Sequence, residues 1–132
     1  MTEAILNEQE LTKRNISQIL SQLTTVYQNT RSERKEITTE FPPANDEFSL
    51  LEEIELLTVN LRGYSSQILS TEQIANKHQV ISQLQIMRVF GISTIGNFYF
   101  SSNGRYEQTK NYIRMLDYLR LLLLEYLQSV EN

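Results

Sequence analysis

The segment that follows Asn103-Gly104 and runs to about Val130 constrains the fold most. Its spacing predicts one helix, with Asn103 as the N-terminal cap. Apolar side chains cover most of the circumference of this helix. They are Tyr112, Ile113, Met115, Leu116, Leu119, Leu121 to Leu124, Tyr126, Leu127 and Val130. A helix that is apolar nearly all round is buried. We therefore expect it either at the centre of its own domain or against a partner protein.

Residues that form turns are scarce, with four glycines and two prolines among 132 residues. Because β-sandwiches and barrels need frequent turn residues, the sequence predicts an all-α fold. The length fits one domain, over residues 1–132. Pro42-Pro43 cannot lie inside a helix, so it separates an N-terminal helix within residues 1–40 from a helical core over residues 46–132. We expect an all-α bundle of four to five helices with a Pro-Pro break after the first helix.

Two helices are expected on either side of that break. The first is predicted from about Thr2 to Arg34, with residues 31–35 as its solvated end. The second begins near Ser49, because Ser49 and Glu52 have the spacing of a capping box. It then carries the most regular heptad pattern in the chain. The heptad positions are Leu50, Ile54, Leu57, Leu61, Tyr64 and Ile68.

A third helix is predicted to begin near Ser70, which has capping-box spacing to Gln73. Its end stays open between two alternatives. The apolar stripe favours continuation to about Phe100, whereas residues 98–104 also resemble a short hairpin with an Asn-Gly turn.

The residues that most catalytic sites need are missing. His78 is the only histidine, and the chain has no cysteine. A di-iron bundle needs two Glu-x-x-His motifs, and a zinc site usually needs several histidines or cysteines. No glycine-rich phosphate loop or Gly-x-Ser-x-Gly elbow occurs either. We therefore expect a protein that is not an enzyme and that has no catalytic residue, cofactor or metal site.

The leading hypothesis is a non-catalytic assembly or adaptor subunit that acts through helix–helix contacts in a larger complex. Heptad stripes and apolar excess are typical of such contacts. The candidate interface residues are Leu50, Ile54, Leu57, Leu61, Tyr64, Leu121, Leu123 and Tyr126. The same heptads are equally consistent with packing inside the chain. The partner is expected to be a protein, in a hetero- or homo-oligomer.

Two alternative functions follow from the charges, whose net value is −4. The acidic excess lies in residues 1–66, so the chain could be an acidic inhibitor or immunity protein that covers a basic target. The basic side chains of the last helix alternate with tyrosines, a pattern that suits phosphate contact and base stacking. They are Arg105, Lys110, Arg114 and Arg120. The second hypothesis is therefore a small helical subunit of a nucleoprotein complex that binds RNA or DNA.

The sequence also favours an intracellular protein, cytoplasmic or nuclear. The absence of cysteine suits a reducing compartment. The segment from Met1 to Ala4 lacks the basic region and apolar run of a secretory signal. The apolar run from Leu121 to Leu124 is far shorter than a membrane span, so no membrane association is expected.

Overall fold

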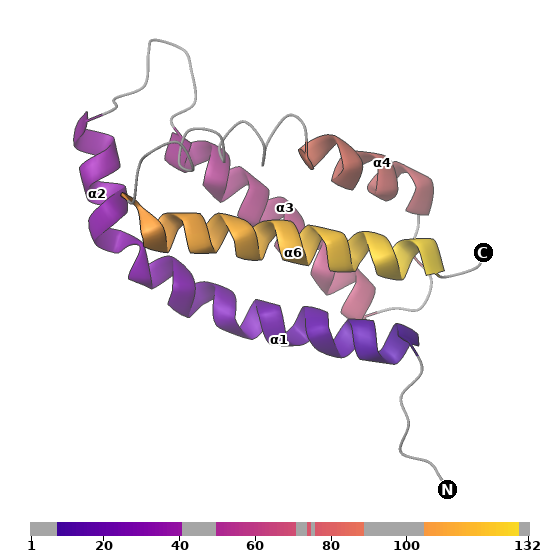
Figure 1. Ribbon diagram of the computed structural model, residues 1–132. Helices are drawn as coiled ribbons and strands as arrows, with labels where there is room; N and C mark the ends of the chain where they lie inside the picture. Colours follow the sequence, from indigo (N-terminus) through magenta and orange to yellow (C-terminus); the bar gives the residue numbers. More distant parts are fainter. Residues whose placement is uncertain (1–7, 41–49, 71–73, 75, 89–104, 130–132) are drawn as a thin grey trace, which may run out of the picture.

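The computed structural model describes residues 8–40, 50–70, 74, 76–88 and 105–129, and its regular elements in these ranges are all α-helices (Figure 1). The all-α fold class is thereby confirmed for the described part of the chain. The helices are α1 (Glu8–Asn29), α2 (Arg31–Glu40), α3 (Leu50–Ser70), α4 (Lys77–Met87) and α6 (Glu107–Ser129). None of them is long and apolar enough to cross a membrane.

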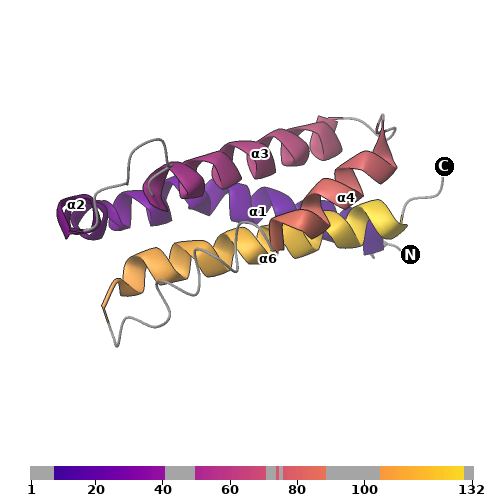
Figure 2. The same ribbon diagram turned by 90° about the horizontal axis from the view of Figure 1, so that it is seen from above.

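Helix α6 is the element around which the others are arranged. It packs against α1, α3 and α4, and it also contacts α2. Figures 1 and 2 show α1 running alongside α6 and α3 behind it, with α4 near the end that carries Ser129. Twelve residues of α6 are buried. Of the two expectations for this apolar helix, the structure matches the central position in its own domain.

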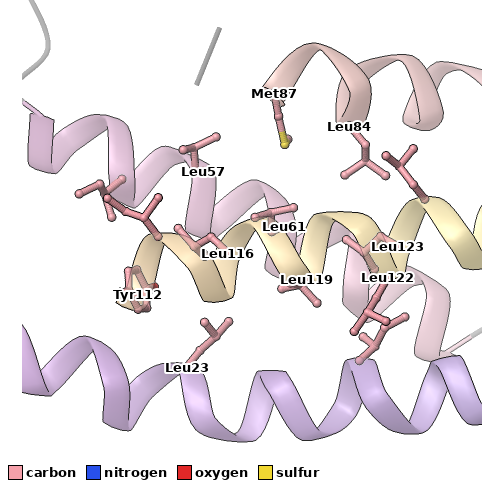
Figure 3. Packing of buried hydrophobic residues seen from close by; sticks show 14 of the residues in the cluster. Leu23, Leu57, Leu61, Leu84, Met87, Tyr112, Leu116, Leu119, Leu122 and Leu123 are labelled. Atoms are coloured by element: carbon pink, nitrogen blue, oxygen red, sulfur yellow. The ribbon is translucent and has the colours of Figure 1, made fainter. Parts of the chain in front are cut away.

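The core is a layer of aliphatic side chains between α6 and the three helices that surround it (Figure 3). Leu23 of α1, Leu61 of α3 and Leu84 of α4 are fully buried, and their side chains point toward α6. Leu116 and Leu119 meet them from α6. The apolar spacing in the sequence therefore reports the faces that pack within this chain.

The N-terminal helix differs from its prediction, because it ends at Asn29 and α2 begins at Arg31. The backbone N–H of Thr30 donates to the carbonyl of Tyr27 at 3.0 Å, and its hydroxyl donates to the same oxygen at 2.6 Å. A threonine hydroxyl that binds nearby backbone competes with the helical hydrogen-bond ladder. Arg34 then donates its N–H to the Thr30 carbonyl at 2.8 Å. A single helix to Arg34 is therefore wrong, and residues 31–35 are the start of α2.

Two other helix starts differ from the prediction. Ser70 is the last residue of α3, and α4 begins at Lys77 after Asn76, whose φ of 59° is left-handed. A left-handed residue cannot continue a right-handed helix, and asparagine is among the few residues that adopt this conformation readily. Helix α6 begins at Glu107, directly after Tyr106 with the same φ. Several predicted features lie outside the described residues. They are the helix start near Thr2, Pro42-Pro43, the cap at Ser49, the helix or hairpin over residues 92–104, the cap at Asn103 and the helix end near Val130.

Candidate protein-interaction surface

The heptad stripe of α3 belongs to the core of this chain. Ile54, Leu57 and Leu61 are buried, and Tyr64 is half-buried against the core. The side chain of Leu50 lies outside the described residues. Because the other helices of the chain already cover these side chains, they offer little area to a partner. Of the two readings of the heptads, packing inside the chain matches this burial, and the stripe does not form the exposed candidate surface.

The candidate interface residues of α6 separate into two groups. Leu123 and Tyr126 are buried in the core. Leu121 points outward and is 47% exposed. Tyr118, three residues earlier, is 49% exposed. Only a narrow apolar strip of this helix is therefore open among the residues that the structure describes.

Arg120 was a candidate for phosphate contact, but it is 4% exposed and braces two helices. Its Nε donates to Asp117 at 2.9 Å, and its guanidinium donates to the backbone oxygen of Leu84 in α4 at 3.3 Å. Arg88, the C-terminal cap residue of α4, donates to the same aspartate at 3.2 Å. A buried charge needs such partners, since an unpaired one is costly. Arg120 is therefore a packing residue and is not available to a phosphate.

The three remaining basic candidates also differ in access. Lys110 is 5% exposed, and its ammonium lies 3.5 Å from the carboxylate of Glu107. Arg105 and Arg114 are exposed. Arg105 pairs with Glu36 of α2, and Arg114 donates to the side-chain oxygen of Asn111 at 3.0 Å. Two of the four predicted contacts are thus open to a nucleic acid.

A residue that the sequence did not single out holds the start of α6. The carboxylate of Glu33 in α2 accepts the backbone N–H of Gln108 at 3.0 Å and that of Thr109 at 2.8 Å. It also accepts the hydroxyl of Thr109 at 2.8 Å. The first N–H groups of a helix have no partner within it, and a negative charge is favourable at that end. Glu33 is therefore an N-terminal cap supplied by another helix.

A half-open groove lies between α1 and α3, with a volume of about 330 Å³. Its lining comes from three helices, with Tyr112 contributed by α6. The lining residues are Thr24, Tyr27, Glu55, Thr58, Val59, Arg62 and Tyr112. These residues are up to 88 positions apart in the sequence, so their proximity follows from the fold alone.

Two tyrosines form the aromatic part of the groove. The rings of Tyr27 and Tyr112 have their centroids 5.1 Å apart and are tilted by 50°, a favourable aromatic geometry. The hydroxyl of Tyr112 shares a hydrogen bond of 2.8 Å with Thr58. Burial raises the pKa of Tyr112 above its usual value, against the opposing effects of the Thr58 hydrogen bond and the Arg62 charge. Burial likewise raises the pKa of Tyr27. Both rings are therefore neutral at physiological pH.

The charged residues of the groove are Glu55 and Arg62, two turns apart on α3. Glu55 accepts the hydroxyl of Tyr27 at 3.2 Å, and Arg62 donates to the hydroxyl of Thr24 at 3.2 Å. Both bonds are exposed. Among the described residues neither side chain takes part in an ion pair. Each therefore keeps unused hydrogen-bonding capacity, since a guanidinium has five donors and a carboxylate several lone pairs.

Beside the groove, α3 exposes two apolar side chains on the side away from the core. Leu56 is 48% exposed and Val59 is 65% exposed, three residues apart on one face. Val59 is an apolar residue of α3 that lies outside the heptad positions, and it stands opposite the heptad stripe. The sequence could have shown this exposure, because at 100° per residue Leu56 and Val59 lie about half a turn around the helix from Leu61.

The side of α1 that borders the groove next to Tyr27 carries uncharged polar side chains. Thr24 lines the groove, and Ser17, Ser21 and Gln28 share its helical face at spacings of three, four and seven residues. All four are exposed. The face formed by α1 and α3 thus combines an aromatic groove, two exposed apolar side chains and one charge of each sign.

Comparisons with known proteins found no family model, no curated protein and no solved structure that matches this chain. Within the described ranges, no group of three histidine, aspartate or glutamate side chains could hold a metal ion.

Proposed function

We propose that this chain is a helical bundle built around α6 that serves as a non-catalytic assembly or adaptor subunit, and that it binds another polypeptide through the face of α1 and α3. The observation that carries the proposal is the exposure of Leu56 and Val59 beside the groove. These two side chains lie next to each other on α3, whereas scattered single apolar residues are ordinary on protein surfaces.

Burial of these side chains supplies a driving force for binding. Fully burying a leucine or valine side chain contributes roughly 1.5–3 kcal/mol. Since about half of each side chain is exposed, a contact that covers Leu56 and Val59 gains about 1 kcal/mol from each. The tyrosines add area at little cost in side-chain entropy, which is why tyrosine is frequent at interfaces.

The shape of this face fits a helical partner. Helix α3 has 21 residues, α1 has 22, and the groove lies between them. An amphipathic helix binds such a groove with apolar residues spaced three and four apart. This supports helix–helix contact as the mode of assembly, now on the outer face of α3 and not on its heptad stripe.

No specific observation in the described residues favours the two alternative functions. Nucleic-acid binding would rest on Arg105 and Arg114, because Lys110 and Arg120 are buried. Inhibition of a basic target would need a concentrated acidic face, and Glu33 and Glu36 are engaged with α6 and Arg105. Both alternatives stay predictions.

A photocrosslinking amino acid at position 59 tests the proposal. In cells that produce the full chain, the variant at Val59 should form covalent adducts with a polypeptide on irradiation. The matched control is the same amino acid at Glu125, which is exposed on α6. Adducts at position 59 that are absent at position 125 support the proposal, and an equal yield or no adduct at position 59 contradicts it.

A further inference from the structure

We infer that the polypeptide bound by this face is a second copy of the chain, with the two α3 helices packed antiparallel. This inference rests on the proposed function and names its partner. It follows from the arrangement of charges along α3. When a second α3 runs in the opposite direction, each charge lies opposite a charge of the other sign.

Glu55 and Arg62 lie seven residues apart and both line the groove, so they project from the same side of α3. A two-fold axis perpendicular to the helix, passing between positions 58 and 59, reverses the order of residues in the second copy. Glu55 of one copy then lies opposite Arg62 of the second copy, and the reverse pair forms by symmetry. The two charges of the face thus give two intermolecular ion pairs.

The same axis brings the exposed apolar residues together. Going along the axis of α3, the apolar side chains of the two copies alternate. Leu56 of the first copy is followed by Val59 of the second, then by Val59 of the first and Leu56 of the second. At a rise of 1.5 Å per residue, neighbours in this order are about 1.5–3 Å apart along the axis, which is the reach of interlocking side chains. The pair therefore covers the most exposed apolar side chain of the described residues, Val59, with its own symmetry mate.

No like charges oppose each other in this register. Glu52 and Glu53, in the first turn of α3, lie opposite Ser65 and Tyr64 of the second copy, which are uncharged. The neighbouring face of α1 carries the uncharged polar side chains of Ser17, Ser21, Thr24 and Gln28. Like charges placed directly opposite would disfavour association, so their absence here supports this register.

Each charge has room for the new partner. Arg62 uses its guanidinium for one exposed bond to Thr24, and Glu55 accepts one exposed bond from Tyr27. A fork of donors and a carboxylate with two oxygens can keep these bonds and pair across the interface. Dimerisation therefore costs neither groove contact.

The test is the oligomeric state of the full chain by sedimentation equilibrium at protein concentrations from about 1 µM to about 200 µM. The expected result is a concentration-dependent species of twice the chain mass of 15.5 kDa. E55R and R62E should each raise the dimer dissociation constant by about tenfold or more, since two attractive pairs become two repulsive ones. The double variant E55R/R62E should restore the wild-type constant.

The control is E125R, which makes the same charge change on exposed α6. It should leave dimerisation unchanged. Because Glu55 and Glu125 are exposed and Arg62 is half-buried with an exposed hydrogen bond, circular dichroism should show the same helix content in all variants. A dimer that forms but is weakened by E55R and not rescued by the double variant overturns the antiparallel register.

The inference and the proposed function fail in different ways. A chain that stays monomeric over the whole concentration range overturns the second-copy inference. Mass spectrometry of the position-59 adduct tests the proposed function separately. For a chain that dimerises, a peptide from α3 of another copy supports both. A peptide from a different protein overturns only the inference, and the absence of any adduct overturns both.

Discussion

Replacing Glu33 by alanine should destabilise the fold more than the removal of any other carboxylate in α2. Three hydrogen bonds join this side chain to the first turn of α6, at 2.8–3.0 Å. In the variant, water can reach the N–H of exposed Gln108. Thr109 is almost fully buried, so its N–H and hydroxyl lose their partner without replacement.

The magnitude follows from these contacts. Removing a helix cap costs about 0.5–2 kcal/mol, and leaving a buried donor unpaired costs about 1–3 kcal/mol. We expect Glu33→Ala to lower the free energy of unfolding by about 2–3 kcal/mol. Glu33→Gln keeps an oxygen that can accept one N–H but removes the charge, so it should cost about 1 kcal/mol.

Urea unfolding monitored by far-ultraviolet circular dichroism measures both losses, at one protein concentration for all variants. Glu36→Ala is the matched control, because it removes the same side chain one turn later in α2. Its ion pair with Arg105 is nearly half exposed, so its loss should cost less than about 1 kcal/mol. If Glu33→Ala cost no more than Glu36→Ala, the capping role of Glu33 would be refuted.

Three further predictions concern other parts of the fold. Gly63→Ala should stabilise α3 by about 0.5–1 kcal/mol, since nothing lies within 4 Å of the added Cβ; a loss of stability in thermal unfolding would contradict this. Asp117→Ala should lower the free energy of unfolding in urea by about 2 kcal/mol, because it leaves buried Arg120 without its carboxylate. Arg88→Ala, at an exposed residue, should cost at most about 1 kcal/mol. Equal losses would argue against a buried charge cluster. Burial raises the folded-state pKa of Tyr112 above its unfolded value. The contribution of Tyr112 to stability is therefore complete below about pH 10 and is lost as the pH rises through the folded pKa. Tyr112→Phe should make the free energy of unfolding fall less steeply over that range, and an unchanged slope would contradict the assignment.

The features that could be predicted from the sequence are those that depend on the pattern of apolar residues within one helix. The last helix is apolar around most of its circumference, and that pattern predicted that it is buried, either at the centre of its own domain or against a partner protein. The heptad positions of α3 identified its buried face in the same way. Both patterns depend only on burial along one helix, which periodicity records.

The sequence did not predict the features that depend on distant partners. Residues 31–35 carry charges of both signs and resemble a solvated helix end, because nothing within the segment indicates that Glu33 meets Thr109, 76 residues later. Thr30 lies between two segments with helical composition, and the sequence does not indicate that its N–H and hydroxyl both bind the carbonyl of Tyr27 at the break. The basic residues of the last helix were candidates for phosphate contact, which requires exposed charge. Arg120 is buried instead, because Asp117 and the backbone oxygen of Leu84 satisfy its guanidinium.

The groove was beyond sequence reasoning for a similar reason. Its lining combines side chains of α1, α3 and α6 that no single period connects. The spacing of Leu56 and Val59 places them on one face of α3, but it does not show which other helices lie beside that face.

The position of α6 in the chain also determines when the fold can form. During synthesis α1, α3 and α4 are made before the helix that covers Leu23, Leu61 and Leu84. At translation rates of 5–20 residues per second, the interval between Met87 and Ser129 lasts roughly 2–8 s. Throughout that time the nascent chain presents three apolar faces without their common partner. The earlier helices therefore cannot complete their packing until α6 has been synthesised.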